Sequence, residues 1–218
     1  MMTRSLTSAP AVVAGTEGYA GDAEWLIPRY ESVDFLEKYR AVAHLFPQKP
    51  ARILDVGAGT GADAGWLAKK GHQVMAVEPV AAFREAGRRL HPSPMIEWVD
   101  DSLPALSAIP PSQESFDLVL VSAVWHHLSV AEREQAMSRF AALVGVGRPL
   151  IFSIKNGPHP ANRRVFDVSV EETILLAAAH HFKSVVNLRA ASVQILNRQA
   201  GVTWSWLAFV RQLSCDED

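Results

Sequence analysis

Short apolar segments alternate with amphipathic ones along most of the chain. Five of them are rich in valine, isoleucine and leucine and are bounded by glycine, proline or polar turns, which is typical of buried strands: 51–56, 72–78, 95–99, 116–124 and 148–154. Segments with helical spacing lie between most of them, at 61–71, 80–90 and 129–144. Strands alternating with helices of this length predict a parallel sheet with helices on both faces.

Two serines mark expected helix starts. Ser129 is followed by Glu132, and Ser169 by Glu172, and this spacing is the signature of a capping box. Upstream, residues 22–46 also have a helical pattern, which ends before a proline.

The C-terminal part follows a different pattern. Residues 183–190 and 202–212 read as two strands with no helix between them, and residues 204–209 alternate between two faces. Strands joined without a crossover helix are expected to be antiparallel. The prediction is therefore a Rossmann-like α/β fold, with a seven-stranded, mostly parallel sheet that closes with a C-terminal antiparallel hairpin.

Length and composition set the broad class. The 218 residues suit one domain, which we assign to 22–212, with 22–50 as an N-terminal helical cap and 1–21 as a flexible segment. The net charge of -2, without a basic run, argues against a general nucleic-acid binder. The single cysteine, Cys215, fits a reducing cytoplasm. No apolar run approaches the roughly 20 residues that span a bilayer, so no membrane partner is expected.

A glycine-rich turn follows the first predicted strand, in the sequence ILDVGAGTGADAG. In an open α/β sheet such a turn lies at the edge where ligands bind, and the next helix points its free N–H groups at the ligand. A P-loop would need lysine and then serine or threonine after Gly61, where Ala62 and Asp63 stand instead. The dinucleotide pattern G-x-G-x-x-G/A does match, at Gly57, Gly59 and Ala62.

A longer pattern, D-x-G-x-G-x-G, begins at Asp55 and resembles the first motif of class I S-adenosylmethionine-dependent methyltransferases. Three later segments are similar to the same family: Glu78-Pro79 after the second strand, the acidic run 100–104 (DDSLP), and 116–128 (FDLVLVSAVWHHL). The resemblance covers roughly residues 25–211 in order.

The resemblance implies methyl transfer from S-adenosylmethionine to an oxygen, nitrogen or carbon nucleophile, with S-adenosylhomocysteine as product and a small molecule as the expected acceptor. The residues it implies for cofactor binding are Asp55, Gly57, Ala58, Gly59, Gly61, Glu78, Pro79, Asp100, Asp101, Ser102 and Ser122. Either aspartate of the acidic run could hold the adenine amino group. Two alternatives remain open: an NAD-dependent oxidoreductase, and a protein that binds S-adenosylmethionine without transferring its methyl group.

Two histidines follow the fourth strand and are candidate catalytic bases, because histidine can accept a proton near neutral pH. We expect His127 to bond to the backbone and fix its loop, and leave His126 open as a contact to the acceptor. Trp125 is expected to wall the pocket, and Tyr30 to belong to a lid from the N-terminal side.

The connection after the fifth strand, 155–169, is long and carries Arg163 and Arg164. Arginine can grip a carboxylate or phosphate with two parallel bonds, so this loop is expected to bind an anionic group on the acceptor. The ends of the fourth and fifth strands lack carboxylates, and hard cations prefer oxygen ligands, so no catalytic metal is expected. The Asn/Asp-Pro-Pro-aromatic motif of nucleic-acid amino-group methyltransferases does not occur after the fourth strand.

Overall fold

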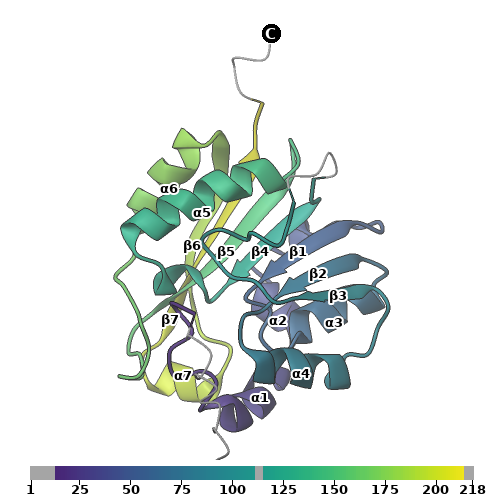
Figure 1. The fold of residues 1–218 in the computed structure, drawn as a ribbon. Coiled ribbons are helices and arrows are strands. Elements are labelled where there is room, and N and C mark those ends of the chain that lie inside the picture. The colour runs from purple at the N-terminus through teal and green to yellow at the C-terminus, as the bar shows by residue number, and fades with distance from the viewer. Residues whose placement is uncertain (1–12, 111–114, 214–218) are drawn as a thin grey trace, which may run out of the picture.

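The computed structural model describes residues 13–110 and 115–213, which form one seven-stranded sheet in the order β3-β2-β1-β4-β5-β7-β6 (Figure 1). Strand β7 is antiparallel to both of its neighbours, and all other pairs are parallel. The predicted sheet and its C-terminal antiparallel pair are therefore confirmed. The strands are β1 (Arg52–Val56), β2 (Gln73–Val77), β3 (Ile96–Val99), β4 (Leu118–Ser122), β5 (Pro149–Asn156), β6 (Phe182–Ala191) and β7 (Thr203–Arg211).

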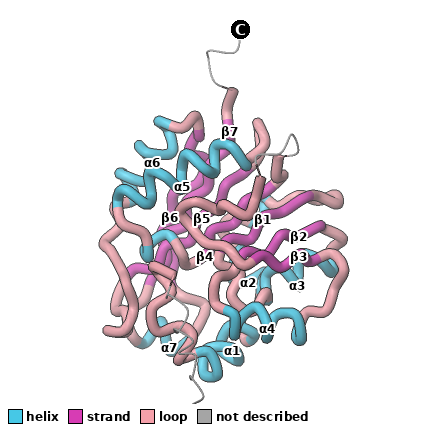
Figure 2. The backbone as a smooth tube through the Cα atoms, viewed as in Figure 1, coloured by secondary structure: helices cyan, strands magenta, loops and turns pink. Residues whose placement is uncertain are grey.

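Helices cover both faces of the sheet (Figures 1 and 2). Helices α2 and α3 contact each other on one face, α5 and α6 contact each other on the other, and α1 packs on α4. The helices are α1 (Ala23–Glu31), α2 (Phe35–Tyr39), α3 (Ala62–Lys69), α4 (Ala81–Leu90), α5 (Val130–Leu143), α6 (Val170–Ala179) and α7 (Ile195–Gln199), with short 3-10 turns η1 (Ala43–Leu45) and η2 (Trp125–His127).

The central strands send alternate side chains into two separate cores. On β1, Ile53 joins the core under α2 and α3, while Leu54 joins the core under α5 and α6. On β4, Leu120 and Val121 divide in the same way. Successive residues of a strand point to opposite faces, so a strand covered on both sides must be apolar throughout. This is why these segments lack polar alternation.

The alternation predicted for β7 is confirmed: Trp206 and Ala208 face the α2–α3 core, and Leu207 and Phe209 face the α5–α6 core. The prediction of no helix between the last two strands is wrong, because the short helix α7 lies there. Its five residues carry no N-terminal side-chain cap and bury no side chain, so they leave little sequence signal.

The helix predicted over 22–46 is also wrong as a continuous element. It is broken into α1, α2 and η1. The reason is local: the Asp34 side chain accepts a hydrogen bond of 2.7 Å from the Glu37 backbone N–H and so caps a new helix. The break lets α1 pack on α4 while α2 packs on α3.

Both serines cap their helices as predicted, but only Ser129 makes the complete capping box. Ser129 Oγ accepts from the Glu132 N–H, and Glu132 Oε2 accepts from the Ser129 N–H, which completes the capping box. Ser169 Oγ accepts from the Glu172 N–H at 3.1 Å. Among the residues that the structure describes, no helix is long and apolar enough to cross a membrane.

Residues 13–21 form hydrogen-bonded turns, in which the Tyr19 N–H donates to Thr16 and the Asp22 N–H to Gly18. Asp22 in turn pairs with Arg163, from the loop after β5. These contacts tie 13–21 to the rest of the fold, and residues 1–12 lie outside the described residues, so the flexibility of 1–21 stays a prediction. Cys215 lies outside them as well.

Candidate functional site

A cavity of about 300 Å³ opens at the carboxyl ends of β1, β2 and β4. The turns of 14–19, helices α1 and α2, and the chain after β6 complete its walls. The parallel strands of the sheet end here on either side of β1, and this is where open α/β sheets bind ligands. The position predicted from the glycine turn is therefore the position of the cavity.

The three glycines of the turn all have left-handed backbones, with φ of +70° at Gly57, +57° at Gly59 and +75° at Gly61. An added Cβ at Gly57 would lie 2.3 Å from Val124, and one at Gly61 would lie 2.6 Å from the Trp98 ring. At Gly59 the nearest atom would be the Tyr30 ring at 3.5 Å, an ordinary contact. Gly57 and Gly61 thus permit close packing, whereas Gly59 lines the cavity beneath the Tyr30 ring.

Glu78 joins the glycine turn to the end of β2. Its Oε2 accepts from the Gly59 N–H and its Oε1 from the Val80 N–H, both at 2.8 Å. The residue is only 5% exposed, and this burial raises the pKa of its carboxyl to about 7. Glu78 and Pro79 both line the cavity, so this carboxylate can still offer its remaining lone pairs to a ligand.

The two aspartates of the acidic run differ in their surroundings. Asp100 pairs with Arg84, its side chain is 68% exposed, and it does not line the cavity. Asp101 and Ser102 do line it. The Asp101 carboxylate accepts from the Ser102 and Ala108 N–H groups, both at 2.7 Å, which fixes its direction. Of the two, Asp101 is the one placed to meet a ligand.

Asp55 is buried in β1 below the glycine turn and does not line the cavity. Its Oδ2 is buried without a hydrogen-bond partner among the described residues. Burial, and then the nearby charge of Asp63, raise the pKa of the Asp55 carboxyl well above its usual range. Asp63 itself is held by Lys38 at 2.5 Å and by the Tyr39 hydroxyl at 2.6 Å.

The raised pKa of Asp55 predicts a loss of stability in alkaline solution. Above pH 6.5 the unfolded aspartate is fully ionised while the folded one still binds a proton, so the unfolding free energy should fall as pH rises toward the folded pKa. Glu78 contributes in the same direction up to about pH 7. The lowered pKa values of His126 and His127 act in the opposite direction, mainly below about pH 6.5, where unfolded histidines become protonated. Urea denaturation at pH 6.5 and 8.5 measures this difference.

Asp55→Asn keeps the shape of the side chain and removes its titration, so we expect a smaller loss between the two pH values than in wild type. Glu134→Gln, at an exposed position on α5, is the matched control and should keep the wild-type difference. A wild-type loss that persists in full in Asp55→Asn would contradict this account.

The two histidines differ from each other in their surroundings. His126 is 3% exposed, does not line the cavity, and packs against the rings of His127 and His159. Its burial lowers its pKa to about 2, so it stays neutral. The role of His126 as a contact to the acceptor stays a prediction that this placement does not support.

His127 lines the cavity and bonds at both ring nitrogens. Nδ1 donates to the Arg164 carbonyl at 2.6 Å, as the expected backbone bond requires. Because a carbonyl oxygen only accepts, the neutral ring carries its proton on Nδ1, and Nε2 then accepts from the Tyr19 hydroxyl at 2.9 Å.

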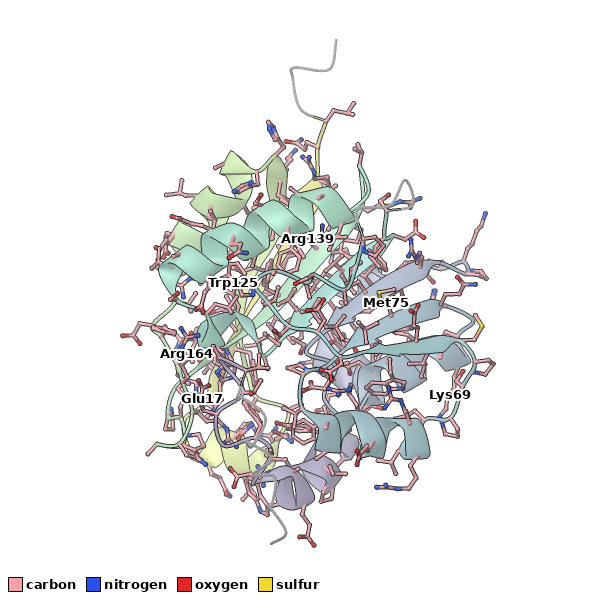
Figure 3. The ribbon with its side chains drawn as sticks, in the orientation of Figure 1. Glu17, Lys69, Met75, Trp125, Arg139 and Arg164 are labelled. Carbon is pink, nitrogen blue, oxygen red and sulfur yellow. The ribbon has the colours of Figure 1, made fainter. Side chains whose placement is uncertain are left out.

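Trp125 is a core residue, and the prediction that it walls the pocket is wrong. It is fully buried beneath α5, where Figure 3 labels it, and packs on Phe140 and Phe152. Its Nε1 donates to Thr173 in α6 at 3.2 Å. The reason is the 3-10 turn after β4, which directs the first side chain of η2 inward while the chain continues to His127 at the cavity.

The arginines of the 155–169 loop are already engaged, and neither lines the cavity. Arg163 pairs with Asp22 at 2.7 Å and lies 4.1 Å from the Tyr19 ring centre. Arg164, which is labelled in Figure 3, makes two hydrogen bonds to the Glu132 carboxylate. The predicted binding of an anionic acceptor by these two arginines is therefore not supported, because each guanidinium already pairs with a carboxylate of the protein.

Tyr30 and Ser122 do line the cavity, as predicted. Tyr30 packs on Phe83 and lies over Gly59, and Ser122 Oγ lies 3.0 Å from Ser153 Oγ. Sequence reasoning missed the far wall, which comes from α2, β6, β7 and the residues that directly follow α2 and β6: Lys38, Arg40, 190–194, Trp204 and Trp206. No local sequence pattern marks these positions, because they come together only in the folded tertiary structure.

Within 13–110 and 115–213 no group of three or more histidine, cysteine, aspartate or glutamate residues could hold a metal ion. The absence of a catalytic metal stays a prediction.

Comparisons with known proteins agree with this geometry. A family model described as a methyltransferase domain matches residues 53–148. The chain is 31% identical over 159 residues to a demethylmenaquinone methyltransferase of Clavibacter sepedonicus, covering 72% of this chain and 60% of that protein. An uncharacterised methyltransferase of Anoxybacillus flavithermus is 26% identical over 121 residues, 55% of each chain. The chain spans about half or less of the first curated relatives it matches.

Solved structures share the fold. A Burkholderia thailandensis 1,6-didemethyltoxoflavin-N1-methyltransferase, with bound 1,6-didemethyltoxoflavin and S-adenosylhomocysteine, superposes with a TM-score of 0.66 at 20% identity, over 95% of this chain and 94% of that one. A TehB-like methyltransferase of Corynebacterium glutamicum gives 0.63 at 19% identity, over 88% and 99%. With the sheet order, the glycine turn and the sequence matches, the chain belongs to the class I S-adenosylmethionine-dependent methyltransferase family.

Proposed function

We propose that the chain transfers a methyl group from S-adenosylmethionine to a small molecule. The observation that carries the proposal is the cavity at the ends of β1 and β2, where the Gly59 N–H donates a hydrogen bond to the buried Glu78 carboxylate. The first turn of α3, which lines the cavity at Ala62 and Asp63, suits the carboxylate end of a ligand, and the Glu78 carboxylate suits ribose hydroxyls.

The residues present fit that cofactor. Gly57, Ala58 and Gly59 would hold its methionine part, Glu78 its ribose, and Asp101 its adenine amino group. Asp55 lies beneath the turn, so it would act by supporting it. Once bound, the cofactor supplies a methyl group already activated by a positively charged sulfur, and what the chain has to add is positioning, which contributes several kcal/mol in well-aligned reactions.

A small acceptor is favoured by the cavity and by two relatives. The cavity is closed by the 14–19 turns, α1, α2 and the chain after β6, and its volume suits a small ligand. The Clavibacter protein is named for demethylmenaquinone, and the Burkholderia structure holds 1,6-didemethyltoxoflavin. A cytoplasmic location is part of the proposal, because a single cysteine cannot form an intrachain disulfide.

Calorimetry tests the cofactor directly. We expect S-adenosylmethionine and S-adenosylhomocysteine to bind, and NAD not to bind. Tight binding of NAD, with no heat from either adenosyl compound, would favour the oxidoreductase alternative.

Label transfer tests the reaction. S-adenosylmethionine labelled in its methyl group is incubated with a panel of small molecules that carry hydroxyl, amino, thiol or carboxylate groups. We expect label on at least one member. Tight adenosyl binding with no label on any member would favour a protein that binds the cofactor without transferring its methyl group.

A further inference from the structure

The cavity contains a tyrosine–histidine pair made by two distant parts of the chain. Tyr19 comes from the turns before α1, and His127 ends the 3-10 turn after β4, 108 residues later. The Tyr19 hydroxyl and His127 Nε2 lie 2.9 Å apart, and the two rings meet edge to face with centres 5.6 Å apart. Both residues line the cavity.

The chain fixes this pair from both sides. The Arg164 carbonyl holds the proton of His127 on Nδ1, so Nε2 keeps a free electron pair for the Tyr19 hydroxyl. Arg163 lies over the Tyr19 ring, donates to the Glu17 carbonyl at 3.3 Å, and pairs with Asp22.

Two glycines allow the segment to come this close. A Cβ at Gly15 would lie 3.3 Å from the His127 Cβ, and one at Gly18 would lie 2.1 Å from an Arg163 nitrogen. Arg163, which the sequence suggested as a site for an anionic group, therefore holds Tyr19 in place through these contacts.

Three carboxylates of the cavity wall accept hydrogen bonds from the protein itself. Asp63 accepts from Lys38 and Tyr39, Glu78 accepts from two backbone N–H groups, and Asp101 does the same. The His127 ring is different, because its Nε2 bonds to the Tyr19 hydroxyl and both residues line the cavity. A proton released in the cavity can reach Nε2 through that hydroxyl.

We propose that Tyr19 and His127 together accept the proton that the methyl acceptor loses, so that the acceptor is a molecule with a hydroxyl or an N–H group at the methylated atom. The proposal rests on the proposed function and adds the class of acceptor to it. Tyr19 is the catalytic residue that touches the acceptor, and His127 acts through it.

The step balances in atoms and charge. The acceptor's oxygen or nitrogen forms its bond to the methyl carbon while the carbon–sulfur bond breaks and its electron pair returns to sulfur. The acceptor's proton passes to Tyr19 Oη, and the proton of Tyr19 passes to His127 Nε2. The positive charge thus moves from sulfur to the imidazole ring, whose Nδ1–H stays on the Arg164 carbonyl.

Charged and titratable groups face the pair from every neighbouring element. They are Glu17 from the same segment as Tyr19, Tyr30 from α1, Glu78 from the end of β2, His126 from η2, and His159, Arg163 and Arg164 from the loop after β5. Burial lowers the pKa of His127 and raises that of Tyr19, so both are neutral at pH 7 and Nε2 keeps its electron pair.

The test uses Tyr19→Phe and His127→Asn in the full chain, with the panel member that wild type labels best. Phenylalanine keeps the ring packing and loses the hydroxyl, while asparagine keeps a donor for the Arg164 carbonyl and loses the acceptor nitrogen. Each should lower kcat roughly 100-fold at pH 7, which is the lower range for a proton-transfer group. The deficit should shrink as pH rises through the pKa of the acceptor itself, because an ionised acceptor has no proton to lose.

Two controls separate this role from a structural one. His180→Gln, at the end of α6, should keep wild-type kcat, and both test variants should bind S-adenosylhomocysteine within twofold of wild type by calorimetry. An acceptor that proves to be a carboxylate, or a Tyr19→Phe variant whose deficit is absent or equal at all pH values, would overturn the proton role alone. Failure of wild type to label any panel member would overturn both this proposal and the function on which it rests.

Discussion

Glu78→Ala should weaken the binding of S-adenosylhomocysteine by at least about tenfold. Hydrogen bonds to a charged group contribute roughly 1.5–3 kcal/mol each, and about 1.4 kcal/mol is a factor of ten in Kd. The variant also leaves the Gly59 and Val80 N–H groups without their partner, so the glycine turn loses its tie to β2. Calorimetry measures Kd, and circular dichroism shows that the variant is folded.

The pH dependence identifies the carboxylate as the cause. Because burial places the pKa of Glu78 at about 7, an increasing share of the folded protein carries a protonated Glu78 below that pH, with fewer sites to accept ribose hydroxyls. Affinity should therefore rise as pH increases from 6 to 8 in wild type, and Glu78→Gln should bind weakly and with little change over that range. A folded Glu78→Ala with wild-type Kd would place the ribose elsewhere.

Gly57→Ala should destabilise the fold by roughly 2–5 kcal/mol. A left-handed backbone costs a residue with a Cβ about 1–2 kcal/mol. The new methyl group would also lie 2.3 Å from Val124, a branched side chain with little rotamer freedom, and such overpacking costs about 1–3 kcal/mol more. Urea denaturation of the protein without ligand measures the change in unfolding free energy.

Gly201→Ala is the matched control for Gly57→Ala. Its φ is +75° against +70° at Gly57, but an added Cβ would meet no atom within 4 Å. Only the backbone term of about 1–2 kcal/mol then applies. Equal losses in the two variants would show that Val124 moves aside without cost, and that close approach is not the reason for Gly57.

Most of the fold was predictable because its signals are local. The apolar runs at 51–56 and 148–154 follow from strands covered on both faces, and the alternation over 204–209 follows from the period of a strand. Ser129 and Glu132 cap α5 through atoms three residues apart. The helix over 22–46 was predicted wrongly where a second local signal, the Asp34 cap, competed with the longer pattern.

The residues of the candidate site also divide into those that local sequence signals could predict and those that they could not. The glycine turn and Glu78 could be assigned to the ligand edge from the sequence, because each directly follows its strand and parallel strands end at one edge of the sheet. The same reasoning brought in Trp125, which the structure buries, and it could not choose between Asp100 and Asp101. Which of two adjacent loop residues faces a cavity depends on the backbone dihedral angles between them, and the local sequence does not determine those angles.

The sequence by itself determined the class of fold, the order of its strands along the chain, and the turn that meets the ligand. Only the tertiary structure decided that Tyr19 reaches His127, and that Arg163 pairs with Asp22 across 141 residues. The physical reason is range. Periodicity and caps act over a few residues and leave a pattern in the chain, whereas a contact between distant segments depends on how the sheet and its connections bring them together.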